Sequence, residues 1–369
     1  MDAVKRVEIA DTKLTEKEIE AVVGVLRSGM LRQGPQCEAF EREFAAKVGA
    51  KFCYTNANGT AALHLAFLAF LKPGEEVLVP AFTFIATGSA VTLAGGKPVF
   101  CDVDLQSGLL DLDDAERRVT PRTRAIAPVH LFGNVCDIDR VRAFAQRHKL
   151  VIVWDAAQAH GATWHGADVG SFGDFVCYSF YPTKNMFVGE GGITATDNPA
   201  YAEKLKVMRS HGQTGRYVHT MIGLNYRMTD IEAAIGRQQL GRLDQMVAIR
   251  RRNAGILNES LSDLPGIRLL RVTPGAESAW HQYSIVVDER TFGCGRDALA
   301  ERLNAAGIGT GVHYPRGLHQ QPVFEELYGK MSLPATEALA AGILALPVHH
   351  GVSADDARRV AAAVRDSRG

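Results

Sequence analysis

The chain has 369 residues, of which 46% are hydrophobic and 22% charged. This composition is typical of a globular protein, and the length predicts two packed units rather than one core. Lysine plus arginine equals aspartate plus glutamate at 41 each, so no basic field favours nucleic acid or anionic lipid. The longest apolar stretch, 61–71, is interrupted by His64 and is too short to span a bilayer.

The N-terminal segment lacks the apolar region of a signal peptide. The six cysteines are scattered and form no CxxC pair, which indicates buried free thiols rather than disulfides or a metal site. We therefore expect a cytoplasmic protein that binds no membrane, nucleic acid or metal.

Between residues 51 and 196, short β-rich runs alternate with helical patterns. The predicted helices cover 59–71 and 138–149. After a first strand in 51–57, the predicted strands cover 75–82, 97–104, 124–132, 150–155, 174–181 and 191–196. Continuously apolar strands that alternate with helices predict an α/β fold with a mainly parallel sheet covered on both faces.

The pattern changes at Thr229. The segment 229–261 has helical periodicity and opens with Thr229 and Glu232 at the spacing of a capping box. A smaller α+β pattern follows. It consists of a strand at 281–288, a helix at 296–307, a strand at 309–315 and a terminal helix from Ala354. We expect a large domain over 1–250, which includes the N-terminal segment, and a small C-terminal domain over 251–369.

Polar residues follow the predicted strands where a parallel sheet binds ligands, at the carboxyl ends. Gly59 and Thr60 open a helix there, and their backbone N–H groups suit a phosphate; a plain glycine turn with a threonine cap is the alternative. Asp155 ends a buried strand, where a carboxylate needs a cation or donors. Such an aspartate suits the protonated ring nitrogen of pyridoxal 5′-phosphate (PLP), although it could instead cap the following turn. Gln158 is placed to donate to the ring hydroxyl.

Lys184 follows the aromatic strand 174–181 and precedes the glycine-rich stretch 189–192. A loop lysine is usually solvated, but burial behind such a strand would lower its pKa and make it a nucleophile toward an aldehyde. Ser179 adds a hydroxyl for a phosphate, and Phe84 is an aromatic that could stack on a flat ring or belong to the core. One cofactor, PLP, explains all these residues together.

Ten ordered blocks of the chain resemble the DegT/DnrJ/EryC1/StrS family of PLP-dependent sugar aminotransferases. They cover residues 31–45, 56–66, 79–87, 95–104, 128–137, 154–162, 169–185, 189–192, 223–236 and 312–315. The resemblance implies a fold-type-I PLP transferase, similar to aspartate aminotransferase, with a smaller α+β C-terminal domain. It also implies a homodimer with shared active sites. The implied reaction is ping-pong transamination from an amino acid, most simply L-glutamate, to a nucleotide-linked 3- or 4-keto-6-deoxyhexose.

The resemblance also assigns roles residue by residue. Lys184 matches the lysine that carries PLP as a Schiff base, and Asp155 matches the partner of the ring nitrogen. The remaining matches are Gln158 at the ring hydroxyl, Gly59, Thr60 and Ser179 at the phosphate, Phe84 on the ring, Asn225 at the partner subunit's phosphate, and His313 and Tyr314 at the sugar.

A lysine at position 184 favours the aminotransferase branch, because related sugar dehydratases carry histidine there. A PLP-dependent dehydratase and a non-catalytic regulatory member of the same fold stay open as alternatives. A Rossmann oxidoreductase is disfavoured, because 189–192 precedes a strand rather than opening a helix. No arginine clamp for the donor carboxylates is evident, and Arg32 and Arg227 are named only as guesses.

Overall fold

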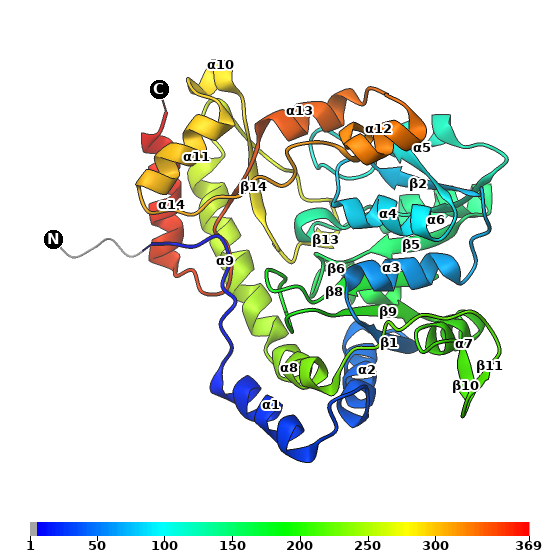
Figure 1. The fold of residues 1–369 in the computed structure, drawn as a ribbon. Coiled ribbons are helices and arrows are strands. Elements are labelled where there is room, and N and C mark those ends of the chain that lie inside the picture. The colour runs from blue at the N-terminus through cyan, green and yellow to red at the C-terminus, as the bar shows by residue number, and fades with distance from the viewer. Residues whose placement is uncertain (1–5, 369) are drawn as a thin grey trace.

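A seven-stranded sheet forms the centre of the larger part of the molecule (Figure 1). The computed structural model describes residues 6–368. The strands of this sheet are β1 (Phe52–Asn56), β2 (Glu76–Pro80), β3 (Lys97–Cys101), β4 (Thr123–Ile126), β5 (Val151–Asp155), β8 (Phe175–Ser179) and β9 (Gly192–Thr196). Their order is β1-β9-β8-β5-β4-β2-β3. Strand β9 is antiparallel to both neighbours and the other pairs are parallel, which confirms the mainly parallel sheet.

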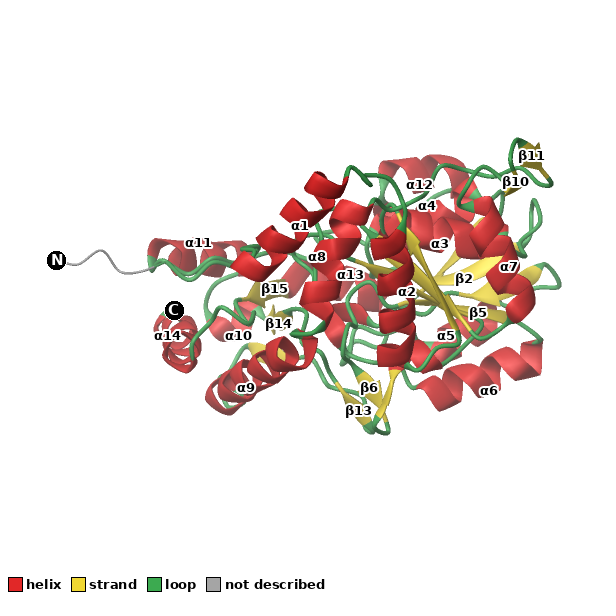
Figure 2. Ribbon diagram, turned by 90° about the horizontal axis from the view of Figure 1, so that it is seen from below, coloured by secondary structure: helices red, strands yellow, loops and turns green. Residues whose placement is uncertain are grey.

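Helices cover both faces of this sheet (Figure 2). The helices of the larger part are α1 (Glu16–Ser28), α2 (Pro35–Val48), α3 (Gly59–Leu68), α4 (Ile85–Leu93), α5 (Leu112–Arg118), α6 (Ile138–His148), α7 (Pro199–Met208) and α8 (Asp230–Leu240). Successive side chains of a strand point to opposite faces. Val77 and Val79 of β2 accordingly belong to the apolar cluster that contains Leu65 of α3, whereas Leu78 belongs to the cluster that contains Phe144 of α6. Burial on both faces explains why the strands are continuously apolar.

The smaller part has its own three-stranded antiparallel sheet and its own apolar cluster. The sheet consists of β12 (Ile267–Leu269), β14 (Tyr283–Val287) and β15 (Ile343–Leu346). The helices from here to the C-terminus are α9 (Leu243–Leu261), α10 (Glu289–Phe292), α11 (Arg296–Ala305), α12 (Pro322–Tyr328), α13 (Pro334–Gly342) and α14 (Ala354–Asp366). The expected domain boundary at residue 250 falls inside α9, and this division stays a prediction.

Two short sheets complete the fold. One joins β6 (Thr163–Trp164), β7 (Ala167–Asp168) and β13 (Ala276–Glu277). The other is a hairpin of β10 (Gln213–Gly215) and β11 (Val218–His219), which projects from the larger part beside α7 (Figure 1).

Two details of the sequence-based prediction are wrong. The helical segment 229–261 is two helices, because α8 ends at Leu240 and α9 starts at Leu243; Gly241, a poor helix former, lies at the break. The capping box of Thr229 and Glu232 is present at the start of α8. The predicted strand 309–315 is a loop that makes a single bridge, from Gly311 to Ala345. Glycine and proline weaken a strand, and this loop contains two glycines and ends at Pro315.

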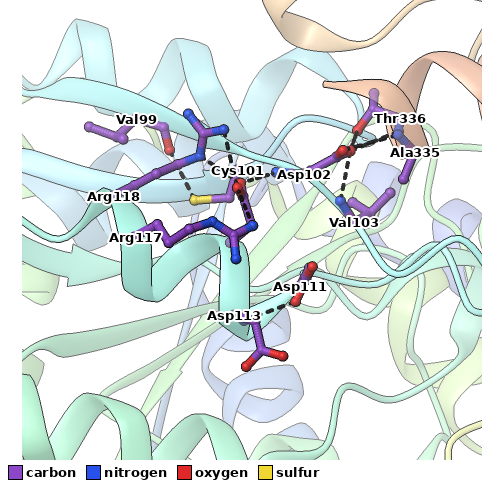
Figure 3. Close-up of polar contacts among 11 residues, drawn as sticks. Val99, Cys101, Asp102, Val103, Asp111, Asp113, Arg117, Arg118, Ala335 and Thr336 are labelled. Atoms are coloured by element: carbon purple, nitrogen blue, oxygen red, sulfur yellow. Dashed lines mark hydrogen bonds and ion pairs between the residues drawn. The ribbon is translucent and has the colours of Figure 1, made fainter. Parts of the chain in front are cut away.

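Asp102, which directly follows β3, bonds to the first turn of α13 (Figure 3). Its carboxylate accepts hydrogen bonds from the backbone N–H groups of Ala335 and Thr336 at 3.0 and 2.8 Å. These N–H groups have no partner within a helix, and a negative charge favours the positive end of the helix. The Asp102 backbone N–H in turn donates to Asp114 at 2.7 Å. Asp102 therefore joins the edge of the large sheet to the C-terminal part of the chain.

No helix within residues 6–368 is both long and apolar enough to cross a membrane. In the same range, no three His, Cys, Asp or Glu side chains are grouped so that they could hold a metal ion. All six cysteines are buried and none forms a disulfide, as the sequence predicts.

Candidate active site

A cavity of about 680 Å³ lies at the edge of the large sheet where the parallel strands end. Residues that follow β1, β2, β5 and β8 form most of its wall. The rest comes from two segments of the C-terminal part, His281–Gln282 and His313–Tyr314. This is the place where open α/β sheets bind their ligands.

The start of α3 forms one end of the cavity. Asn58 caps the helix by accepting a hydrogen bond from the Ala61 N–H at 2.8 Å. Gly59 and Thr60 are the first two helical residues, whose N–H groups have no partner within the helix. A Cβ atom on Gly59 would lie 2.6 Å from Cβ of Ser179, so only glycine lets Ser179 lie this close to the start of α3. Free N–H groups, a positive helix end and a hydroxyl together suit a phosphate.

Asp155, the last residue of β5, is buried at the bottom of the site. Its Oδ2 accepts a hydrogen bond from the Thr87 hydroxyl at 2.7 Å, and its Oδ1 accepts one from the Ala157 N–H at 3.1 Å. Burial raises the pKa of Asp155, and these two hydrogen bonds and the charge of Lys184 oppose the rise. The carboxylate makes no ion pair within residues 6–368. A buried carboxylate of this kind favours a cationic ligand.

Lys184 lies in the turn after β8, where its backbone N–H donates to the Tyr181 carbonyl at 2.9 Å. The next residue, Asn185, is buried and donates from Nδ2 to the Ala279 carbonyl at 2.8 Å. This bond fixes the turn against the C-terminal part of the chain. Burial lowers the pKa of Lys184 to about 8, while the negative charge of Asp155 acts in the opposite direction. At this pKa roughly a tenth of the amine is neutral and nucleophilic at pH 7, far more than for an ordinary lysine.

Aromatic and amide side chains complete the wall. Phe84 is 55% exposed, so it is a cavity residue and not part of the core. The ring of Tyr314 lies 6.1 Å from the rings of both Phe82 and Phe84. Gln158 is buried, accepts a hydrogen bond at Oε1 from the Phe132 N–H at 2.6 Å, and donates from Nε2 to the Tyr314 hydroxyl at 3.0 Å.

The structure brings nine of the ten predicted site residues into this one cavity. They are Gly59, Thr60, Phe84, Asp155, Gln158, Ser179, Lys184, His313 and Tyr314. The tenth, Asn225, is exposed and does not line the cavity of its own chain. Arg32 and Arg227 do not line it either, and Arg227 donates to the Ser210 hydroxyl.

Sequence reasoning missed three residues at the site. Thr87 lies in a predominantly apolar helix. A single hydroxyl among apolar residues is the only sequence feature that could indicate it. Glu190 lines the cavity from the loop before β9, inside a glycine-rich stretch that the sequence singled out only for its glycines. His281 lines it from the segment before β14 and is buried, and burial together with the charge of Lys184 lowers its pKa well below the ordinary value. No local pattern marks His281, because only the packing of the C-terminal part brings it to Lys184.

The residues present fit PLP. A helix N-terminus with a serine suits its phosphate, a buried carboxylate without an ion-pair partner suits its ring nitrogen, and a lysine amine of lowered pKa suits its aldehyde. The fold and this cavity define a fold-type-I PLP-dependent transferase of the aspartate-aminotransferase type.

Comparisons with known proteins show to which family of PLP-dependent transferases the chain belongs. The sequence profile of the DegT/DnrJ/EryC1/StrS aminotransferase family matches residues 12–365. The chain belongs to this family, and it is a PLP-dependent sugar aminotransferase by that membership.

Two relatives align with most of the chain. The erythromycin biosynthesis sensory transduction protein EryC1 of Saccharopolyspora erythraea is 40% identical over 92% of this chain and 92% of its own length. The dTDP-3-amino-3,4,6-trideoxy-alpha-D-glucose transaminase of Streptomyces venezuelae is 37% identical over 98% of this chain and 96% of its own.

Solved structures of related proteins superpose on nearly the whole chain. A crystal structure of S. venezuelae DesV superposes with a TM-score of 0.94 at 36% identity, covering 98% of both chains. The PLP form of the sugar aminotransferase Spr1654 from Streptococcus pneumoniae gives 0.92 at 29% identity, also covering 98% of both chains.

Proposed function

We propose that this protein moves an amino group from an amino acid, L-glutamate, to a nucleotide-linked 3- or 4-keto-6-deoxyhexose by ping-pong transamination at Lys184. The observation that carries the proposal is the presence in one cavity of Lys184, with a pKa lowered to about 8 by burial, and the buried carboxylate of Asp155. The similarity to a transaminase of a dTDP-linked sugar supports the substrate class.

PLP, when bound, supplies an electrophilic aldehyde and an electron-withdrawing ring. Lys184 would hold that aldehyde through its amine. The same amine would take a proton from the α-carbon of the amino acid and deliver a proton to the sugar carbon that receives the amine. The lowered pKa suits both steps, because the amine can hold or release a proton near neutral pH.

The other residues bind and orient. Asp155, held by Thr87 and Ala157, would keep the ring nitrogen of PLP protonated, since a negative charge favours the charged form of its partner. Gly59, Thr60 and Ser179 would hold the phosphate. Phe84 would cover the ring and limit the access of water. His313 contacts the sugar from the loop that follows α11.

The donor carboxylates have no arginine partner among the residues that line the cavity. If L-glutamate is the donor, the groups that bind its carboxylates must come from outside this lining. The proposal therefore includes an active site shared between subunits. Asn225 is exposed, as are Met30 and Leu31 between α1 and α2 and Ile222 after the projecting hairpin. These exposed apolar side chains favour burial against a second copy of the chain, which would bring Asn225 to the partner's phosphate.

Complementation tests the shared site. Lys184→Ala and Asn225→Ala are co-expressed, so that half of the dimers combine one chain of each. If the sites are shared, each mixed dimer has one intact site and the mixture has about one quarter of the wild-type activity. If Asn225 acts within its own chain, the mixture gains nothing over the separate variants.

The reaction is tested with a panel of nucleotide-linked keto-sugars and L-glutamate, with products identified by mass and NMR. We expect an amino sugar nucleotide and an equal amount of 2-oxoglutarate. A deoxygenated sugar would establish the dehydratase instead. Absence of any product together with a tightly bound regulatory ligand would establish the non-catalytic alternative.

A further inference from the structure

The side-chain amide of Gln158 has a fixed orientation. Its Oε1 accepts from the backbone N–H of Phe132 at 2.6 Å. A backbone N–H can only donate, so the oxygen of the amide must face Phe132 and the NH2 group must face the other way. That NH2 group lies 3.0 Å from the hydroxyl of Tyr314. Because an amide NH2 group also only donates, the tyrosine hydroxyl is the acceptor in this contact.

Two protons then remain without an acceptor within residues 6–368. One is the second proton on Nε2 of Gln158, and the other is the hydroxyl proton of Tyr314. Both side chains line the cavity. Burial raises the pKa of Tyr314, so its hydroxyl keeps its proton at neutral pH and stays a donor. The cavity wall therefore presents two adjacent donors, one from each part of the chain.

The position of Tyr314 is well supported. Its loop is held to β15 by the two backbone hydrogen bonds between Gly311 and Ala345, at 3.2 and 2.7 Å. Its ring packs against Phe82 and Phe84. The hydroxyl is thus held beside Gln158 by contacts that do not depend on a bound sugar.

Two adjacent donors suit a single oxygen that carries negative charge, because hydrogen bonds to a charged acceptor are the stronger ones. Building on the proposed function, we propose that Tyr314 is a cofactor-binding residue: it fixes the amide of Gln158, and both side chains donate to the ionised ring oxygen of PLP. The position of the C-terminal part of the chain would then affect the cofactor ring through Tyr314. This role goes beyond the sugar contact that the family resemblance implies.

The proposal has a spectroscopic consequence. In bound PLP the ring oxygen would be adjacent to the nitrogen supplied by Lys184, and its negative charge would favour a proton on that nitrogen. Two donors withdraw part of this charge. Removal of one donor should therefore strengthen proton binding at the nitrogen and move the pH-dependent change of the visible absorption band to higher pH.

Tyr314→Phe tests the proposal, because it removes the hydroxyl and keeps the ring. The matched control is Tyr328→Phe, whose hydroxyl pairs with Thr92 at 3.0 Å outside the cavity. Besides Tyr314, the titratable groups that line the cavity are unchanged in both variants; they are Asp155, Tyr181, Lys184, Glu190, His281 and His313.

We expect Tyr314→Phe to weaken PLP binding to the apoprotein about tenfold and to move the titration of the visible band upward by about one pH unit. Tyr328→Phe should leave both measurements at their wild-type values. Gln158→Met should shift both measurements in the same direction, and the double variant should shift them by less than the sum.

Wild-type PLP affinity and an unchanged titration in Tyr314→Phe would overturn the proposal, and a raised KM for the keto-sugar alone would assign Tyr314 to the sugar. These outcomes are distinct from failure of the proposed function. That failure would show in the wild-type protein as a normal visible band without amino transfer.

Discussion

The hydroxyl of Thr87 donates a hydrogen bond of 2.7 Å to Oδ2 of Asp155, across 68 positions of the chain. Both groups are buried, so water cannot replace the bond. Thr87→Val removes this donor, raises the pKa of Asp155 further and weakens its hold on a cationic ring. We expect the dissociation constant for PLP to rise about tenfold, the effect of one hydrogen bond to a charged group.

Thr92→Val is the matched control, since Thr92 lies on the same helix and bonds to the Gly88 carbonyl and Tyr328. Both variants are titrated with PLP as apoproteins, and their melting temperatures are compared. Equal PLP affinity in the two variants would show that Thr87 does not support Asp155.

Gly59 is the second position where we expect a sharp effect. A Cβ there would lie 2.6 Å from Cβ and 3.0 Å from Oγ of Ser179, so Gly59→Ala must displace the end of β8 or the start of α3. We expect a loss of about 1–3 kcal/mol in the free energy of unfolding and weaker binding of inorganic phosphate. Gly24→Ala, on α1 where nothing lies within 4 Å, should instead be neutral or stabilising.

Adding Ser179→Gly to Gly59→Ala removes the clash and also one predicted phosphate ligand. The double variant should therefore recover stability but not phosphate binding. Full recovery of both stability and phosphate binding would show that Ser179 is not a phosphate ligand.

Several features of the site follow from the sequence because strand order alone determines them. Asp155 and Ser179 end neighbouring parallel strands, so a parallel sheet puts them at one edge whatever the details of packing. Gln158 and Lys184 follow in the next turns and share that position. Gly59 at the start of α3 similarly indicates where a phosphate would bind.

Other features depend on tertiary packing and leave no local pattern. The partner of Asp155 is Thr87 and the partner of Gln158 is Tyr314, and the latter pair is separated by 156 positions. The segment 309–315 is predicted as a strand but is a loop, because its glycines leave only one bridge to β15. That same irregularity allows Tyr314 to reach the cavity.

The pH dependence of Lys184 is a third prediction. Its pKa of about 8 lies below the ordinary value of 10.5 because of burial, and Asp155 limits the decrease. Only the neutral amine attacks an aldehyde. The rate at which the apoprotein captures pyridoxal should therefore rise with pH, with a midpoint near pH 8, and then level off. In Asp155→Asn the midpoint should move to lower pH, because a charge that stabilises the ammonium form is lost.

Rates are followed by absorbance, and the modified residue is located by mass after borohydride reduction. Lys184→Arg serves as the control and should show no reaction at this position. A midpoint near pH 10.5 would indicate that Lys184 is solvated rather than buried.

Asp102 gives a fourth prediction, which concerns stability and not catalysis. Asp102→Ala leaves two N–H groups of α13 and the Thr336 hydroxyl without their acceptor. By analogy with lost helix caps, the free energy of unfolding should fall by about 1–2 kcal/mol in denaturant titrations. Glu301→Ala, at an exposed position of α11, should change it by less than about 0.5 kcal/mol. An Asp102 variant as stable as the Glu301 variant would contradict this role.

The most direct test of the central claim is the amount of 2-oxoglutarate formed when the PLP-loaded protein meets L-glutamate without any sugar acceptor. For the wild type we expect one equivalent per bound cofactor, because amino transfer stops after the first half of a ping-pong reaction. Lys184→Ala should form it at least about 100-fold more slowly, the usual contribution of a general acid–base group. Formation at the wild-type rate in Lys184→Ala, or none in the wild type, would contradict the account.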